Sequence, residues 1–148
     1  LRTKKPLALL MVDVDHFKKV NDSYGHAVGD EVLMAVADRL SRHLRSFDTV
    51  ARWGGEEFVV IMPEAETRVA MAVAERLRTK MSEQPVTVRH EVGKLNVTVS
   101  IGVAIAGDDI TTPDDLLRAA DSAMYEAKRQ GRDRIIKADA IIPTAKRA

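Results

Sequence analysis

Hydrophobic residues in this chain gather in short apolar runs and in longer segments with helical spacing. Short runs bounded by proline, glycine or acidic residues are typical of buried strands. The segment 96–106 instead alternates apolar with polar or small side chains, which predicts a strand whose two faces differ. The predicted strands are residues 7–12, 50–53, 58–62, 86–91, 96–106 and 134–137.

Three segments carry apolar side chains at the spacing of an amphipathic helix. They cover residues 29–46, 67–81 and 113–130. Thr67 and Thr112 are the expected N-caps of the second and third helices, and Gly131 is placed to end the third. The order β-α-β-β-α-β-β-α-β predicts an α+β fold, in which helices flank a central, mainly antiparallel sheet of about five strands.

Composition restricts the kind of protein. The chain has 148 residues, 45% of them hydrophobic, which suits one globular domain. Its 23 basic and 22 acidic residues leave a formal charge of +1, which argues against broad nucleic-acid or membrane-surface binding. Without cysteine it has no disulfide or thiolate metal site, and no apolar run approaches the about 20 residues of a membrane span. We expect a cytoplasmic domain at 1–138 and a loosely ordered tail at 139–148.

Two acidic turns lie where apolar runs end. Asp13 follows the run 7–12, and a Gly-Gly pair before Glu56 and Glu57 is a hairpin signal because glycine tolerates positive φ. If the flanking strands are neighbours in one sheet, the carboxylates of Asp13 and Glu56 converge on a space that suits a hard divalent cation, with magnesium the first choice. The alternative is that these acids are solvated residues at strand ends.

Around both turns the chain follows a longer pattern. The segment D-x-D-x-F-K-x-x-N-D is complete, with its fixed places at Asp13, Asp15, Phe17, Lys18, Asn21 and Asp22. The second turn reads Gly-Gly-Glu-Glu-Phe at 54–58, and further segments at 100–103 and 119–132 match the same pattern. Together these segments resemble GGDEF domains, the diguanylate cyclases, over nearly the whole chain. The resemblance implies a fold similar to the adenylyl cyclase catalytic domain and the polymerase palm.

The resemblance also implies an activity. Diguanylate cyclases condense two GTP into cyclic di-GMP and two pyrophosphates, by attack of a 3′-hydroxyl on an α-phosphate with Mg²⁺ or Mn²⁺. By this resemblance Asp13, the backbone carbonyl of Val14 and Glu56 bind metal, and Glu56 and Glu57 are the catalytic acids. Glu57 either binds metal or accepts a proton, and the sequence does not separate the two roles.

Six positions match the substrate contacts of the family. Asn21 and Asp30 match its guanine readers, whose amide and carboxylate complement the donor and acceptor edge of that base. Other positions match groups that hold the phosphates: Phe17 and Lys18 through backbone amides, Lys128 and Arg132 through side-chain cations. From the residues alone, Asn21 is equally a turn residue, Asp30 a helix-start residue and Phe17 a core residue. The two cations also suit a helix C-terminus.

A second constellation concerns control. Arg45 and Asp48 form an R-x-x-D pattern that ends eight residues before Glu56, and it resembles the product-inhibition site of the family. An arginine fork pairs with phosphate and stacks on guanine, and Asp48 can accept from the base edge. Arg76 matches a further arginine of that site. R-x-x-D alone is a common surface pattern, and its distance from Glu56 carries the inference that cyclic di-GMP binds here and slows turnover.

Partners follow from the symmetry of the product. Each domain of this family holds one GTP, so two copies must face each other in a homodimer. The D-x-L-T-G-L-x-N-R segment that usually precedes the first strand is absent from this sequence. We therefore expect a catalytic piece of a longer protein with an upstream regulatory domain, and low activity in isolation. Two other classes stay open: a module that binds GTP or cyclic di-GMP without turnover, and a structural or dimerisation domain. The intact acidic turn favours the enzyme.

Overall fold

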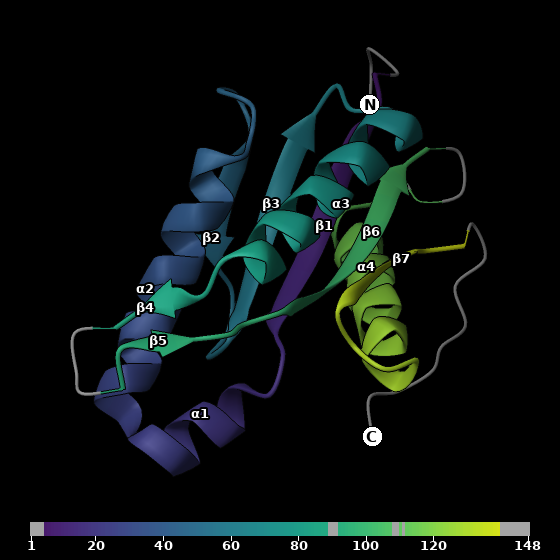
Figure 1. Cartoon of the computed structure of the whole chain (residues 1–148). Coiled ribbons are helices and arrows are strands. Elements are labelled where there is room, and N and C mark those ends of the chain that lie inside the picture. Colours follow the sequence, from purple (N-terminus) through teal and green to yellow (C-terminus); the bar gives the residue numbers. More distant parts are fainter. Residues whose placement is uncertain (1–4, 89–91, 108–109, 111, 140–148) are drawn as a thin grey trace.

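A five-stranded sheet forms the centre of the computed structural model, with strand order β2-β3-β1-β6-β7 (Figure 1). The first four strands in this order pair antiparallel, and β7 joins β6 in parallel. The mainly antiparallel sheet of about five strands is thus confirmed. The strands are β1 (Leu7–Val14), β2 (Thr49–Arg52), β3 (Glu57–Pro63), β6 (Val99–Ala106) and β7 (Arg134–Lys137). The structure describes residues 5–88, 92–107, 110 and 112–139.

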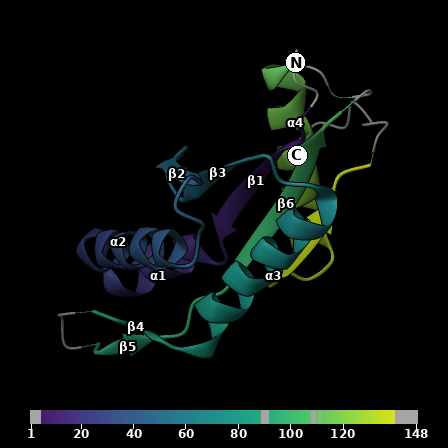
Figure 2. The same ribbon diagram turned by 90° about the horizontal axis from the view of Figure 1, so that it is seen from above.

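Helices cover both faces of this sheet (Figure 2). Along β1, Leu10 and Val12 belong to a core cluster with side chains of α2 and α3, whereas Leu9 and Met11 pack with α4. This alternation is the two-residue period of a strand buried on both sides, which explains why β1 is apolar from Leu7 to Val12. The helices are α1 (Phe17–Tyr24), α2 (His26–Arg42), α3 (Thr67–Glu83) and α4 (Pro113–Arg129). None of the helices among the described residues is both long and apolar enough to cross a membrane.

Helix α1 was not among the predicted elements. Its apolar residues Phe17, Val20 and Tyr24 follow helical spacing, but a segment of eight residues is too short for that spacing to stand out in the sequence. It begins after His16, which has a left-handed φ of 56°, and ends at Gly25, with φ of 89°. Helix α2 follows at once and covers 26–42, not the predicted 29–46.

Two smaller predictions are also corrected. The expected strand at 86–91 is reduced to β4 (Val86–Thr87), which pairs with β5 (Lys94–Leu95) in a separate two-stranded sheet. Residues 89–91, like residues 140–148 of the predicted tail, lie outside the described part of the chain. Thr112 caps α4 as expected, since its Oγ1 accepts a hydrogen bond of 3.1 Å from the Asp115 N–H. Thr67 instead is the first residue of α3, whose N-cap is Glu66.

Candidate active site

The two acidic turns lie side by side in the sheet. Strand β1 pairs with β3 so that Asp13 is opposite Glu57. Just beyond this pair, the Val14 N–H donates to the carbonyl oxygen of Glu56 over 3.1 Å. The two strands are therefore neighbours, as predicted. Their register is what brings Asp13 close to Glu56.

The Gly-Gly turn connects β2 to β3 as a hairpin, as predicted, but neither Gly54 nor Gly55 adopts the positive φ on which that prediction was based. Arg52 is opposite Phe58, and the Trp53 N–H donates to the Glu57 carbonyl over 2.8 Å. The guanidinium of Arg52 donates to the carbonyl oxygens of Gly54 and Gly55, at 3.1 and 2.6 Å. Arg52 had no predicted role, and these two hydrogen bonds hold the shape of the turn that carries Glu56.

Asp13 is the buried member of the acidic pair. The residue is 1% exposed, and burial raises the pKa of its carboxyl to about 8. Lys128 opposes that rise in pKa with an Nζ atom 3.1 Å from Asp13 Oδ1, while the neighbouring carboxyl of Glu56 adds to it. Despite this ion pair, Asp13 Oδ1 accepts no hydrogen bond of good geometry.

These oxygens suit a hard cation. A divalent cation prefers oxygen ligands and is attracted to carboxyl groups that lie close together. Asp13 and Glu56 supply two such groups, and the incompletely bonded Asp13 Oδ1 is available to a ligand. Among the described residues no group of three or more histidine, aspartate or glutamate side chains is placed to hold a metal ion. A metal here would need further oxygens from the backbone or from a bound ligand.

Asn21 lies at the contact between α1 and α2. Its side-chain oxygen presses against Gly29, where an added Cβ would clash with it, and the ring of Phe17 lies beside them. Asp30 follows Gly29 directly, so the two predicted guanine readers come from adjacent helices. Asn21 Oδ1 is buried and has no hydrogen-bond partner, which leaves an acceptor for a ligand N–H.

The predicted phosphate contacts fall into two groups. The Phe17 side chain is 7% exposed and belongs to the core, and Lys18 points outward and pairs with Asp22 at 3.0 Å. A phosphate role for Lys128 requires the last helix to end beside the acidic turn. Helix α4 does end beside β1, and Lys128 contacts Asp13 there. Arg132 follows just beyond, and its Nε is buried without a partner.

The predicted inhibitory residues form a cluster of their own. The Arg45 guanidinium is bonded to both carboxylate oxygens of Asp48, at 2.8 to 3.1 Å, and to the Pro63 carbonyl at 2.9 Å. Arg76 donates to the His43 carbonyl at 2.8 Å. Pro63 and Glu57 are the two ends of β3, so this cluster lies at the end of the strand away from the acidic turn.

Asp15 is one of two fixed residues of the pattern, with Asp22, for which the sequence predicted no role. The structure joins it to Thr98, Ser100 and Asp133, through hydrogen bonds of 2.6 to 3.0 Å. Its fixed place in the D-x-D pattern was the available signal. Its partners are 83 or more residues away, and no local spacing indicates them.

Comparisons with known proteins agree with this geometry. The family model described as "Diguanylate cyclase, GGDEF domain" matches residues 1–134. The response regulator PleD of Caulobacter vibrioides is 47% identical over 131 residues, which make up 88% of this chain and 29% of PleD. Diguanylate cyclase A of Treponema denticola is 42% identical over 142 residues, 96% of this chain and 38% of that protein. The chain thus spans well under half the length of these curated relatives.

Solved structures show the same fold. The GGDEF domain of DgcB from Caulobacter crescentus, solved in complex with c-di-GMP, aligns with a TM-score of 0.86 at 33% identity. The alignment covers 92% of this chain and 80% of that one. Register, turn and sequence match agree, and the chain belongs to the diguanylate cyclase GGDEF domain family.

Proposed function

We propose that this chain is a diguanylate cyclase domain that condenses two GTP into cyclic di-GMP and two pyrophosphates. One observation carries the proposal beyond family membership. Among the described residues, the buried side-chain atoms without a hydrogen-bond partner are Asp13 Oδ1, Asn21 Oδ1 and Arg132 Nε. Buried polar atoms are almost always paired, so an orphaned one asks for an explanation. Each belongs to a different predicted subsite, for metal, guanine and phosphate, so one Mg²⁺-bound GTP could supply all three partners.

The metal subsite consists of Asp13, Glu56 and the Val14 carbonyl. A bound Mg²⁺ or Mn²⁺ would neutralise charge on the phosphates and make the attacking hydroxyl more acidic. Asp13 is buried and the half-buried Glu56 lies next to it, and two neighbouring carboxyl groups favour binding of a cation. Glu57 binds metal or accepts the hydroxyl proton, and both roles stay open.

The remaining residues bind and orient the nucleotide. The Asn21 oxygen accepts a guanine N–H, and the Asp30 carboxylate accepts from the same edge of the base, which adenine cannot reproduce. Lys128 and Arg132 donate to the terminal phosphates, and the amides of Phe17 and Lys18 close the cradle. Each reacting GTP is held by one domain, so a homodimer that brings two such sites together completes the reaction.

Regulation is part of the proposal. Arg45, Asp48 and Arg76 bind cyclic di-GMP and lower the rate, at the end of β3 away from Glu57. The DgcB domain, a structural relative solved with c-di-GMP, supports a product complex. An upstream regulatory domain and a cytoplasmic location complete the proposal. The upstream domain is supported by PleD, which is named as a response regulator and of which this chain matches 29%. The cytoplasmic location is supported by the proposed consumption of GTP.

The cyclase activity is tested by Glu56→Gln. We expect the unchanged chain, at high concentration with GTP and Mg²⁺, to form cyclic di-GMP, and the variant to be at least about 100-fold slower, because a neutral amide lacks the negative charge with which the Glu56 carboxylate would hold the cation. Chromatography of the nucleotides measures both rates. Glu83→Gln, on exposed α3 surface, is the matched control. Product at an undiminished rate from Glu56→Gln would contradict the assignment, and GTP binding without product from either chain would favour the binding module.

The metal subsite is tested without activity by Asp13→Asn. The pKa of this carboxyl is raised from 3.8 to about 8, so the folded state keeps a proton that the unfolded state releases. Stability of the metal-free protein is therefore lost as the pH rises from about 4 to 8. In chelator at pH 8 we expect Asp13→Asn to be roughly 1–3 kcal/mol more stable than the unchanged chain, with a smaller difference at pH 5. Urea unfolding measures both. A variant that is less stable at both pH values would contradict this account.

Product inhibition is tested by Arg76→Ala, which spares the Arg45–Asp48 pair and changes an exposed side chain on the surface of α3. We expect the cyclic di-GMP concentration for half-inhibition to rise at least tenfold, since a bidentate phosphate contact is lost. Each rate is normalised to that of the same variant without product. Arg68→Ala, on the exposed first turn of α3, controls for loss of a positive charge. Inhibition of Arg76→Ala at the concentration that inhibits the unchanged chain would remove Arg76 from the site.

A further inference from the structure

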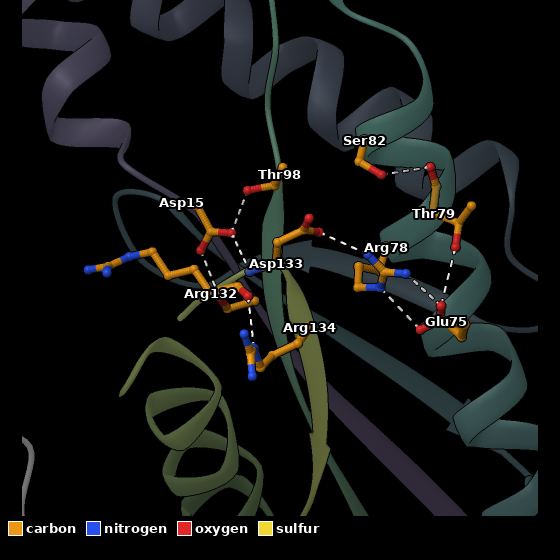
Figure 3. A network of polar contacts seen from close by, with 10 residues as sticks. Asp15, Glu75, Arg78, Thr79, Ser82, Thr98, Arg132, Asp133 and Arg134 are labelled. Carbon is orange, nitrogen blue, oxygen red and sulfur yellow. Dashed lines mark hydrogen bonds and ion pairs between the residues drawn. The ribbon is translucent and has the colours of Figure 1, made fainter. Parts of the chain in front are cut away.

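Asp15 connects three segments that are distant in the sequence. It is 5% exposed and follows the end of β1. Its Oδ2 accepts from Thr98 Oγ1 at 2.6 Å and from the Asp133 N–H at 3.0 Å, and its Oδ1 accepts from Ser100 Oγ at 2.6 Å (Figure 3). A buried carboxylate is stable only when such donors surround it. Asp15 therefore ties the loop before β7 to β6 and to the end of β1.

The loop that Asp15 holds has an unusual backbone. Gly131, Arg132 and Asp133 have φ values of 124°, 68° and 48°, all in the region that residues with a Cβ avoid. The ending of α4 accounts for the first of them. The Gly131 N–H donates to the Lys128 carbonyl and the Arg132 N–H to the Ala127 carbonyl, which is the Schellman pattern with one left-handed residue. The helix ending does not require the left-handed conformations of Arg132 and Asp133. Such conformations persist only where contacts with neighbouring residues stabilise them.

Three contacts hold these two residues from outside. The Asp133 N–H is bonded to Asp15, and Asp133 Oδ1 accepts from Arg78 Nη1 at 3.0 Å. Arg78 is itself fixed on α3 by two bonds to the Glu75 carboxylate. The Arg132 carbonyl accepts from Arg134 Nε at 3.0 Å. Figure 3 shows the Arg132 side chain extending away from the Asp133–Arg78 pair, so these contacts fix its backbone and leave its guanidinium unused.

Asp13 and Asp15, at the end of β1, contact residues on either side of Arg132 in the sequence. Asp13 contacts Lys128, in the last turn of α4, and Asp15 contacts Asp133, at the start of the return to β7. Arg132 lies between these two attachments, and its buried Nε has no partner. Strained backbone that other groups hold in place is typical of functional sites.

We propose that Asp15 is a positioning residue: it fixes the left-handed conformation of Arg132 and Asp133, and so directs the Arg132 guanidinium to the terminal phosphates of the bound nucleotide. The inference rests on the proposed function, because it takes GTP as the ligand. Arg78 is the second tie on the same loop. Asp15 itself touches neither metal nor substrate.

Nucleotide affinity separates positioning from a general effect on the fold. The unchanged chain, Asp15→Ala, Arg132→Ala and the double variant are titrated with Mg²⁺–GTP and with GMP, which lacks the terminal phosphates. We expect Asp15→Ala to weaken GTP binding about tenfold and GMP binding less than twofold. Because Asp15 acts through Arg132, the double variant should bind GTP as Arg132→Ala does. Equal weakening for GTP and GMP, or effects of the two substitutions that multiply, would overturn the proposal.

A conservative variant and a second tie complete the test. Asp15→Asn keeps an oxygen for the Asp133 N–H, and its amide can donate to the Ser100 hydroxyl, so we expect it to restore GTP affinity to within about twofold. If Asp15→Ala does not fold, Arg78→Ala takes its place and should weaken GTP but not GMP, while Arg118→Ala, an exposed arginine of α4, should change neither. Failure of Asp15→Asn to restore binding, or a loss of GMP affinity in Arg78→Ala, would overturn the proposal.

Amide hydrogen exchange gives a readout that needs no nucleotide. Exchange at Asp133 should be at least tenfold faster in Asp15→Ala, and in Arg78→Ala if that variant is used, than in Asp38→Asn, a control at an exposed aspartate. Unchanged exchange would overturn the positioning role even if GTP binds. Absence of GTP binding by the unchanged chain would overturn the proposed function and the role of Arg132, whereas exchange would still show whether Asp15 holds the loop.

Discussion

Burial of the Asp13 carboxyl at the end of β1 is the constraint on which the candidate site depends. The strand is central, with β3 on one side and β6 on the other, and helices cover both of its faces. A carboxyl group at its end is removed from water, and the nearby Glu56 adds a second acid. Among the described residues Lys128 is the cation that compensates this charge, and a bound cation would add to that compensation.

The elements around β1 deliver the remaining groups to the same end of the sheet. Helix α1 follows β1 and carries Asn21, the β2–β3 hairpin carries Glu56, the end of α4 carries Lys128, and the loop after α4 carries Arg132. Asp15 then ties the α4–β7 loop back to β1. Among the described residues, the buried side-chain atoms without a hydrogen-bond partner all belong to this group. The unsatisfied polar groups are therefore concentrated near one end of a well-packed sheet.

Sequence patterns predicted most of this fold for physical reasons that can be named. Strands buried on both faces, such as β1, are continuous apolar runs, and the Gly-Gly turn specifies the β2–β3 hairpin. Helix α1 was missed because eight residues are too few for a helical pattern to stand out, the predicted strand at 86–91 was longer than β4, and β5 has only two residues. The pattern also located Asp13 and Glu56. It could not show the partners of Asp15 or the left-handed backbone at Arg132, because both depend on contacts between distant segments.

The central claim is that the three orphaned atoms form one site for a metal-bound guanine nucleotide. Equilibrium titration of the unchanged chain with GTP and with ATP, each in Mg²⁺ and in excess chelator, tests it most directly. The account predicts that GTP binds at least tenfold more tightly than ATP in Mg²⁺, since the Asn21 and Asp30 positions complement guanine, and that chelation removes most of the affinity. Equal affinity for the two nucleotides, or GTP binding that chelation leaves unchanged, would contradict it.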